Sequence, residues 1–244
     1  MYHREYLAIR EKLITSVLLA RGPPTSLLCA TCEGHHGTYR CLECTLPGLH
    51  CQSCVLSSHS HLPFHRLEKW TGTHFEWCSL QQLGYIYYLG HGGSDCPTSM
   101  INSCNNEVDT DDSDNDEDEW GTTKEASTAS PTSGTQIMTV VSTSGIHQVA
   151  VHWCLCNSKH DKYSQLMAVR LYPSTFTRPK TAFTWEVLDM ASIDSTVCNT
   201  TANSFYQKLR YMTSAPNAWK LKVSPVYLLA RPELTANART GTES

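Results

Sequence analysis

Cysteine and histidine pairs between residues 29 and 65 have the spacing of zinc ligands. Three Cys-x-x-Cys pairs are followed by His59, His61 and His65. Two thiolates three positions apart on a tight turn can both reach one tetrahedral ion about 2.3 Å from each sulfur, whereas neighbouring histidines have no role in a disulfide framework. The pattern therefore predicts zinc sites rather than disulfides. The cysteine pairs are Cys29 and Cys32, Cys41 and Cys44, and Cys51 and Cys54.

Eight such ligands make two sites, and two arrangements are open. Neighbouring pairs can share an ion, or a cross-brace can join the first pair to the third and the second to the fourth. The short gap between Cys44 and Cys51 favours the cross-brace, and in this interleaving the stretch resembles the B-box and RING-like families. His61 is an alternative to His59 as a ligand. The predicted sites are Cys29, Cys32, Cys51 and Cys54 for one ion, and Cys41, Cys44, His59 and His65 for the other.

A third set of ligands is split along the chain. His91 and Cys96 flank a glycine-rich turn, and Cys154 and Cys156 end an apolar segment. One histidine and three cysteines complete a tetrahedral site if the two segments lie side by side, and buried free thiols are the alternative. The remaining cysteines have no partner at ligand spacing and are expected to be ordinary thiols: Cys78, Cys104 and Cys198.

The ligand count determines what kind of zinc these sites would hold. A site with four protein ligands leaves no position for substrate or water, so its metal is structural. We therefore expect about three structural zinc ions, no catalytic residue and no small-molecule substrate.

The elements that would position the ligands indicate an α+β protein. A stretch from 27 to 70 has few aliphatic residues and cannot bury enough apolar surface to fold unaided, so metal must stabilise it. The expected fold is a small zinc-stabilised cross-brace module followed by a zinc-bound, β-rich domain with two C-terminal helices. The expected division is an N-terminal helix at 1–26, the double-zinc module at 27–70, the second domain at 71–213 and an irregular tail at 214–244.

Hydrophobic patterns place strands and helices in the second half of the chain. Ile137 to Val141 and Ile146 to Cys154 predict two strands joined by a hairpin turn, and Gln165 to Tyr172 predicts a third strand. Apolar residues at helical spacing predict helices from Ala182 to Ile193 and from Ala202 to Met212.

Charge is concentrated in one segment. Residues 107–119 hold nine of the 23 acids and no base, so the remaining 14 acids and 19 bases leave the rest of the chain at +5. With the Ser/Thr-rich stretch around it, this run predicts a disordered insertion at 102–135. No window approaches 18 uninterrupted apolar residues, so no membrane contact is expected.

Several motifs together resemble a known family. PFHRLEKW, LGHGG followed by CP, the Cys-x-Cys of VHWCLC, and PKTAFT occur in that order. In these motifs residues 27 to about 213 resemble the cysteine-cluster domain found N-terminal to KDZ (Kyakuja-Dileera-Zisupton) transposases of mushroom-forming fungi. The resemblance implies zinc chelation, including the third site.

The resemblance also implies a function without catalysis. Family members usually continue into an RNase-H-like transposase domain, which we expect to be missing here, as in a truncated or stand-alone relic. We expect a non-enzymatic, nuclear module of transposon origin that contacts DNA or protein. The alternative is a B-box-like or RING-like protein-interaction module, including a ubiquitin-related one. Cations that favour DNA contact are Arg170, Arg178, Lys180, Lys208, Arg210, Lys220 and Lys222.

Overall fold

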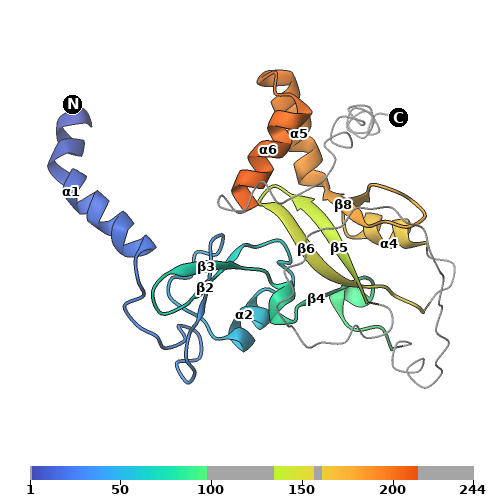
Figure 1. Ribbon diagram of the computed structural model, residues 1–244, viewed down its shortest axis with the longest axis horizontal. Helices are drawn as coiled ribbons and strands as arrows, with labels where there is room; N and C mark the ends of the chain where they lie inside the picture. The colour runs from blue at the N-terminus through green and yellow to red at the C-terminus, as the bar shows by residue number, and fades with distance from the viewer. Residues whose placement is uncertain (1, 98–134, 157–160, 214–244) are drawn as a thin grey trace, which may run out of the picture. The chain divides into compact units, whose positions relative to one another are not determined.

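A computed structural model describes residues 2–97, 135–156 and 161–213 (Figure 1). Contacts within the chain divide it into an N-terminal unit, Met1–Ser58 and Leu67–Cys78, and a C-terminal unit, His59–Arg66 and Ser79–Ser244. Both helices and sheets are present, which confirms the α+β class. The predicted insertion up to residue 134 and the predicted tail at 214–244 lie outside the described residues, as do Cys104, Lys220 and Lys222.

The N-terminal unit begins with the predicted helix, α1 (Tyr2–Arg21). The helix ends because Gly22 donates its N–H to the carbonyl of Leu18, at 2.7 Å, and two prolines follow. Its apolar side chains from Tyr6 to Leu19 are largely exposed. Among the described helices, none combines the length and the apolar character that crossing a membrane requires.

The rest of the N-terminal unit is a small sheet with one short helix. Strands β1 (Tyr39–Cys41), β2 (Leu67–Trp70) and β3 (Phe75–Cys78) pair antiparallel in that order, and α2 (Gln52–Ser58) precedes β2. Arg40 on β1 pairs with Glu68 on β2 at 2.7 Å and lies 3.4 Å from the centre of the Phe75 ring. These contacts join all three strands through one side chain.

The C-terminal unit is built on a five-stranded mixed sheet of order β4-β6-β5-β8-β7. Strands β5 (Thr135–Ser142) and β6 (Gly145–His152) form an antiparallel hairpin, as predicted. The hairpin turn needs a glycine because Gly145 has a φ of +139° and a Cβ there would lie 2.6 Å from the Thr213 hydroxyl. Strand β4 (Ile86–Tyr88) forms one edge and is parallel to β6. Strand β8 (Thr181–Thr184) lies parallel to β5, and β7 (Leu171–Pro173) pairs antiparallel with β8 and forms the other edge.

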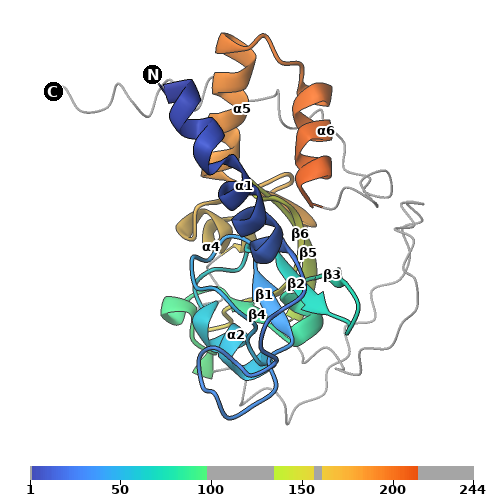
Figure 2. The ribbon, with the colours of Figure 1, turned by 90° about the vertical axis from the view of Figure 1, so that its left-hand side faces the viewer.

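Alternation along the strands gives this sheet two apolar faces. On one face Met138, Val140, Val149 and Val151 pack with Leu166 of α4 (Lys162–Ala168). The opposite face packs against α5 (Trp185–Val197) and α6 (Ala202–Thr213), which lie side by side in Figure 2. That second cluster contains Val141, Ile146, Phe183, Val187, Ala191, Phe205, Tyr206 and Leu209.

Two predicted elements differ from the structure. The segment predicted as a strand from Gln165 to Tyr172 is the helix α4 followed by the short strand β7. The apolar run at 166–169 contains one β-branched residue, and the burial of Leu166 favours the helix. The helix predicted from Ala182 begins later, because Thr184 caps α5 by accepting a hydrogen bond from the Val187 N–H at 3.3 Å.

Two short 3-10 turns complete the C-terminal unit. They are η1 (Gln81–Leu83), which precedes β4, and η2 (His91–Gly93), which follows it.

Candidate metal centres

The first predicted site lies within the N-terminal unit, and its arrangement is the cross-brace one. Cys29 and Cys32 are grouped with Cys51 and Cys54, the third pair along the chain, rather than with the intervening pair. The four ligand atoms lie within 4.8 Å of one another, and the Sγ atoms of Cys32 and Cys51 are 3.9 Å apart. Sulfur atoms about 2.3 Å from one tetrahedral zinc ion would be about 3.8 Å apart, whereas a disulfide needs about 2.0 Å.

Local backbone structure positions these four cysteines. The first pair sits on a tight turn in which the Glu33 N–H donates to the Cys29 carbonyl at 2.9 Å. The pair Cys51 and Cys54 lies at the start of α2, where the Val55 N–H donates to the Cys51 carbonyl at 3.0 Å. A hydrogen bond joins the turns, from the Ala30 N–H to the carbonyl of Leu49 at 2.7 Å. Each pair is therefore set by its own turn, and backbone pairing brings the turns together.

The pKa values of two thiols in this group shift in opposite directions. Burial raises the pKa of the Cys29 thiol, but hydrogen bonds donated by the backbone of Cys32, Cys51 and Thr31 outweigh it, and the pKa falls to about 5. A side-chain hydrogen bond with Cys51, together with burial, raises the pKa of Cys54 to about 12. One sulfur thus favours the thiolate while another resists it beside its neighbours, and a divalent cation would allow all four to be thiolates.

The second predicted set consists of a cysteine pair and a histidine pair. The N–H of Cys44 donates to Cys41 Sγ at 3.3 Å, as expected for a turn that points both sulfurs the same way. In the C-terminal unit, the rings of His59 and His65 lie edge to face with centroids 5.3 Å apart, and His59 is buried. His61 is exposed and lies beside Gly93, where an added Cβ would be 3.8 Å from the His61 Cε1 atom.

The segment that carries these histidines is firmly held. The Tyr85 hydroxyl donates to the Ser60 carbonyl at 2.9 Å, and the Ser144 hydroxyl donates to the Phe64 carbonyl at 2.6 Å. Arg66 donates to the carbonyl of Met212 at 2.6 Å. Residues 59–66 therefore present the histidines from a fixed backbone rather than from a free loop.

Parallel strand pairing assembles the third predicted site. Tyr88 at the end of β4 lies opposite His152 at the end of β6, and the Leu89 N–H donates to the His152 carbonyl at 2.9 Å. Because the strands run the same way, the segments that follow them leave the sheet at the same edge. His91 and Cys96 thereby meet Cys154 and Cys156.

Distances within the third group fit one ion. The Nε2 atom of His91 lies 3.3 Å from the sulfurs of both Cys154 and Cys156. Cys96 is buried, and its sulfur lies 3.9 Å from that of Cys154 and 3.3 Å from that of Cys156. None of these sulfur distances is that of a disulfide.

The glycine-rich turn is needed for this approach. Gly90 has a φ of +91°, and a Cβ there would lie 3.0 Å from the Cβ of Cys154. His91 itself has a φ of +46°, an uncommon conformation for a residue with a side chain. The turn therefore adopts a strained backbone at the point where it carries a ligand, which is a common feature of functional loops.

Gln165 on α4 holds the third site in place, and sequence reasoning missed it. Its side chain accepts a hydrogen bond from the Cys154 N–H at 2.9 Å and donates one to the Cys154 carbonyl at 3.2 Å. No sequence signal marks this residue, because α4 was expected to be a strand. Contacts of this kind fix the orientation of metal ligands.

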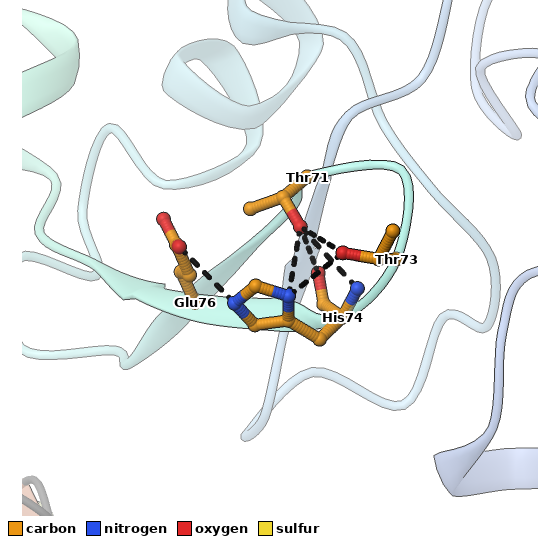
Figure 3. Close-up of polar contacts among 4 residues, drawn as sticks. All are labelled: Thr71, Thr73, His74 and Glu76. Carbon is orange, nitrogen blue, oxygen red and sulfur yellow. Dashed lines mark hydrogen bonds and ion pairs between the residues drawn. The ribbon is translucent and has the colours of Figure 1, made fainter.

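A polar cluster in the turn between β2 and β3 lies outside these groups (Figure 3). His74 Nε2 contacts Glu76 at 3.1 Å and His74 Nδ1 contacts the Thr73 hydroxyl at 2.9 Å, while Thr71 donates to the His74 carbonyl at 2.9 Å. All four side chains are exposed and lie within six residues. Their contacts therefore stabilise a surface turn.

Among the described residues, two groups of cysteine and histidine that each lie within one unit could thus each hold a metal ion. Cys78 and Cys198 belong to none of them. Each group offers four protein ligands, which is the closed coordination of a structural zinc site. The two groups are Cys29, Cys32, Cys51 and Cys54; and His91, Cys96, Cys154 and Cys156. The second predicted set is divided between the units, with Cys41 and Cys44 in the N-terminal unit and His59 and His65 in the C-terminal unit.

Comparison with known proteins gives one family. No curated protein and no solved structure matches the chain. Residues 119–217, which include Cys154, Cys156 and Gln165, match the family described as CxC2 like cysteine cluster associated with KDZ transposases, so the resemblance predicted from the sequence is confirmed for this part of the chain.

Proposed function

We propose that this protein is a non-enzymatic zinc-binding module that acts with a KDZ transposase by contacting DNA or a protein partner. The observation that carries the proposal is the presence of two Cys/His groups, each within one unit, with four protein ligands each. In such groups zinc holds loops in place and has no open position for substrate. Binding through the surfaces that the ions shape is then the function.

Zinc is the metal that the donor sets favour. Cysteine sulfur and histidine nitrogen in groups of four suit zinc, whereas calcium and magnesium prefer oxygen ligands. Zinc would hold the two loops of the third group at one edge of the sheet. In the first group it would join two turns that have little apolar surface of their own.

Metal analysis tests the zinc assignment. Elemental analysis of the purified full chain should find about three zinc ions per chain, and one or none would refute the scheme. Replacing Cys96 with Ala should release one ion and leave the other two bound. The matched control is Cys198→Ala, which should retain all three. Retention of three ions by the Cys96 variant would refute the third site.

Contact with DNA is the form of binding that the transposase association favours, and it implies a nuclear location. A salt titration of binding to duplex DNA tests it, because phosphate contacts make the logarithm of affinity fall linearly with the logarithm of salt concentration. A steep slope would support DNA contact. Absence of any binding at low salt would exclude duplex DNA and leave a protein partner.

A second candidate is a B-box-like protein-interaction module. The cross-brace grouping of Cys29 and Cys32 with Cys51 and Cys54 supports it, since this is the arrangement expected of B-box and RING-like modules. Binding to a folded protein makes no phosphate contacts, so its affinity would fall less steeply with salt, and it would need residues 27–78. The salt slope therefore separates the two candidates.

A further inference from the structure

Exposed aromatic and basic residues gather on the C-terminal unit beside the start of α4. Phe176 lies in the loop between β7 and β8 with 53% of its surface exposed, and Tyr163 on α4 is 37% exposed. Their rings meet edge to face with centroids 5.9 Å apart. Three exposed cations lie on the same two segments, and together these five residues are the aromatic-basic patch: Lys162, Tyr163, Phe176, Arg178 and Lys180.

The loop that carries most of the patch is ordered. The Ser174 N–H donates to the Thr181 carbonyl at 2.9 Å, and the Thr175 hydroxyl donates to the Arg178 carbonyl at 2.9 Å. Gln136 on β5 donates to the carbonyl of the buried Pro179 at 3.2 Å. A second ring, Tyr172, lies 6.4 Å from Phe176, again edge to face. Phe176 is therefore held in an exposed position.

Folding does not explain this exposure. Phe176 contributes little to either apolar cluster of the sheet, because more than half of its surface faces water. The ring presents a stacking surface that a ligand could cover at little entropic cost, since its loop is already ordered.

The net charge of the segments that carry the patch indicates which class of ligand it favours. Segments 161–163 and 174–181 contain three cations and one acid, Asp161, so they carry a net charge of +2. Elsewhere in the unit, Arg170 pairs with Glu186 at 3.1 Å and Lys208 pairs with Asp194, whereas Lys162 in the patch lies 5.2 Å from the centre of the Trp153 ring. The patch is therefore where positive charge and exposed rings coincide.

We propose that the aromatic-basic patch binds a nucleic-acid strand with unpaired bases, one base stacking on Phe176 and the cations contacting the phosphates. Aromatic side chains in a basic setting are the general means of holding single strands, because every base has a π-face. A duplex keeps its bases stacked inside and would gain only the phosphate contacts. This inference rests on the proposed function and names its partner.

Fluorescence anisotropy with the full zinc-loaded chain tests the proposal. The probe is a fluorescein-labelled 20-nucleotide oligothymidylate, compared with an oligouridylate and with a 20-base-pair duplex. Wild type should bind the single strands more tightly than the duplex. Absence of binding to both single strands at 50 mM salt would overturn the proposal while leaving the zinc assignment intact, because zinc content is measured separately.

Two variants separate stacking from charge. Phe176→Ala should weaken single-strand binding about tenfold and leave the salt slope unchanged, because the variant loses the stacking contact with one base but no phosphate contact. The double variant Arg178→Gln and Lys180→Gln should weaken binding and reduce the salt slope by about 1.4, since each phosphate contact contributes about 0.7 on single strands.

Charge-matched controls lie on the same unit. Arg170→Gln and Lys208→Gln each remove one cation that is already paired with an acid, and each should change affinity less than twofold. Equal losses in controls and patch variants would show a general charge effect and refute the patch. Equally tight binding of an oligoglutamate peptide would refute selectivity for nucleic acid. Unchanged zinc content and circular dichroism in every variant exclude misfolding as the cause.

Discussion

The two units of this protein carry groups of side chains that could hold a metal ion, in different structural surroundings. In the N-terminal unit, Cys29 and Cys51 are themselves among the few buried residues, together with Leu49, Val55 and Leu67. The C-terminal unit has two apolar clusters on a five-stranded sheet, and its third metal group lies at the ends of β4 and β6. Zinc would replace a core in the first unit and would fasten loops to an existing core in the second.

The difference shows that ligand count alone does not tell what a zinc ion stabilises. A small unit with little apolar surface depends on metal for most of its folding free energy. A unit that buries large residues such as Phe183, Phe205 and Leu166 has its own folding energy. The same four-ligand site then affects local order rather than the whole fold.

The largest expected effect is loss of the first ion. Cys51→Ser should unfold the N-terminal unit, because structural zinc contributes on the order of 10 kcal/mol in small zinc-finger peptides. Amide hydrogen exchange should show lost protection in residues 27–58 and retained protection in β5 and β6. The control Cys198→Ser alters an exposed cysteine outside the groups. A Cys51 variant with wild-type protection would contradict the view that the N-terminal unit depends on zinc for its folding.

A core substitution tests the other half of the comparison. Phe205 on α6 is 2% exposed and packs in the apolar cluster between the sheet and the helices α5 and α6, so Phe205→Ala should cost the C-terminal unit about 3–5 kcal/mol. Urea unfolding monitored by hydrogen exchange measures this loss in the free energy of unfolding. The zinc of the first group should stay bound. Ile193→Ala, at a side chain 55% exposed, should cost less than about 0.5 kcal/mol. Similar costs for both would contradict the assigned core.

Acid should weaken the C-terminal unit through His147. Burial lowers the pKa of His147 to about 4, with the charges of Arg66 and His65 adding to the effect. An unfolded chain takes up this proton near pH 6.5, and the folded one only near pH 4, so the free energy of unfolding falls as pH decreases through this window.

The contribution of His147 can be measured by comparing the loss of unfolding free energy on acidification in wild type and in a variant without this histidine. His147 should account for about 2 kcal/mol between pH 7 and pH 5. Unfolding of wild type and of His147→Gln at both values should therefore show a smaller loss in the variant. Zinc ligands titrate equally in both proteins, so the difference isolates His147. Equal losses would refute the assignment.

The smallest expected effect concerns the residue that orients a ligand. Gln165→Leu removes both hydrogen bonds to the Cys154 backbone and should weaken zinc at the third group about tenfold or more. Competition with a chelator of known affinity measures this loss. The control Gln207→Leu changes a glutamine of α6 that bonds Arg210 instead. No change in the Gln165 variant would show that the sheet edge alone positions Cys154.

The sequence alone determined the local parts of the structure. Cys-x-x-Cys spacing places two sulfurs on one turn whatever surrounds them, so the sulfur pairs could be predicted from spacing alone. Alternation and a turn signal likewise predicted the β5–β6 hairpin, and the helical spacing of Phe205, Leu209 and Met212 predicted α6. Each of these depends on residues close together in the chain, where backbone geometry leaves few choices.

Only the tertiary structure decided which distant segments meet. Spacing left open whether His91 and Cys96 would reach Cys154 and Cys156, and the parallel pairing of β4 with β6 brings them to one sheet edge. The segment 165–172 was compatible with a strand or a helix. Packing of Leu166 into the core favours a helix over its first part, and from this helix, α4, the side chain of Gln165 reaches the backbone of Cys154. Strand register and burial depend on the whole folded sheet, so no local pattern of residues contains them.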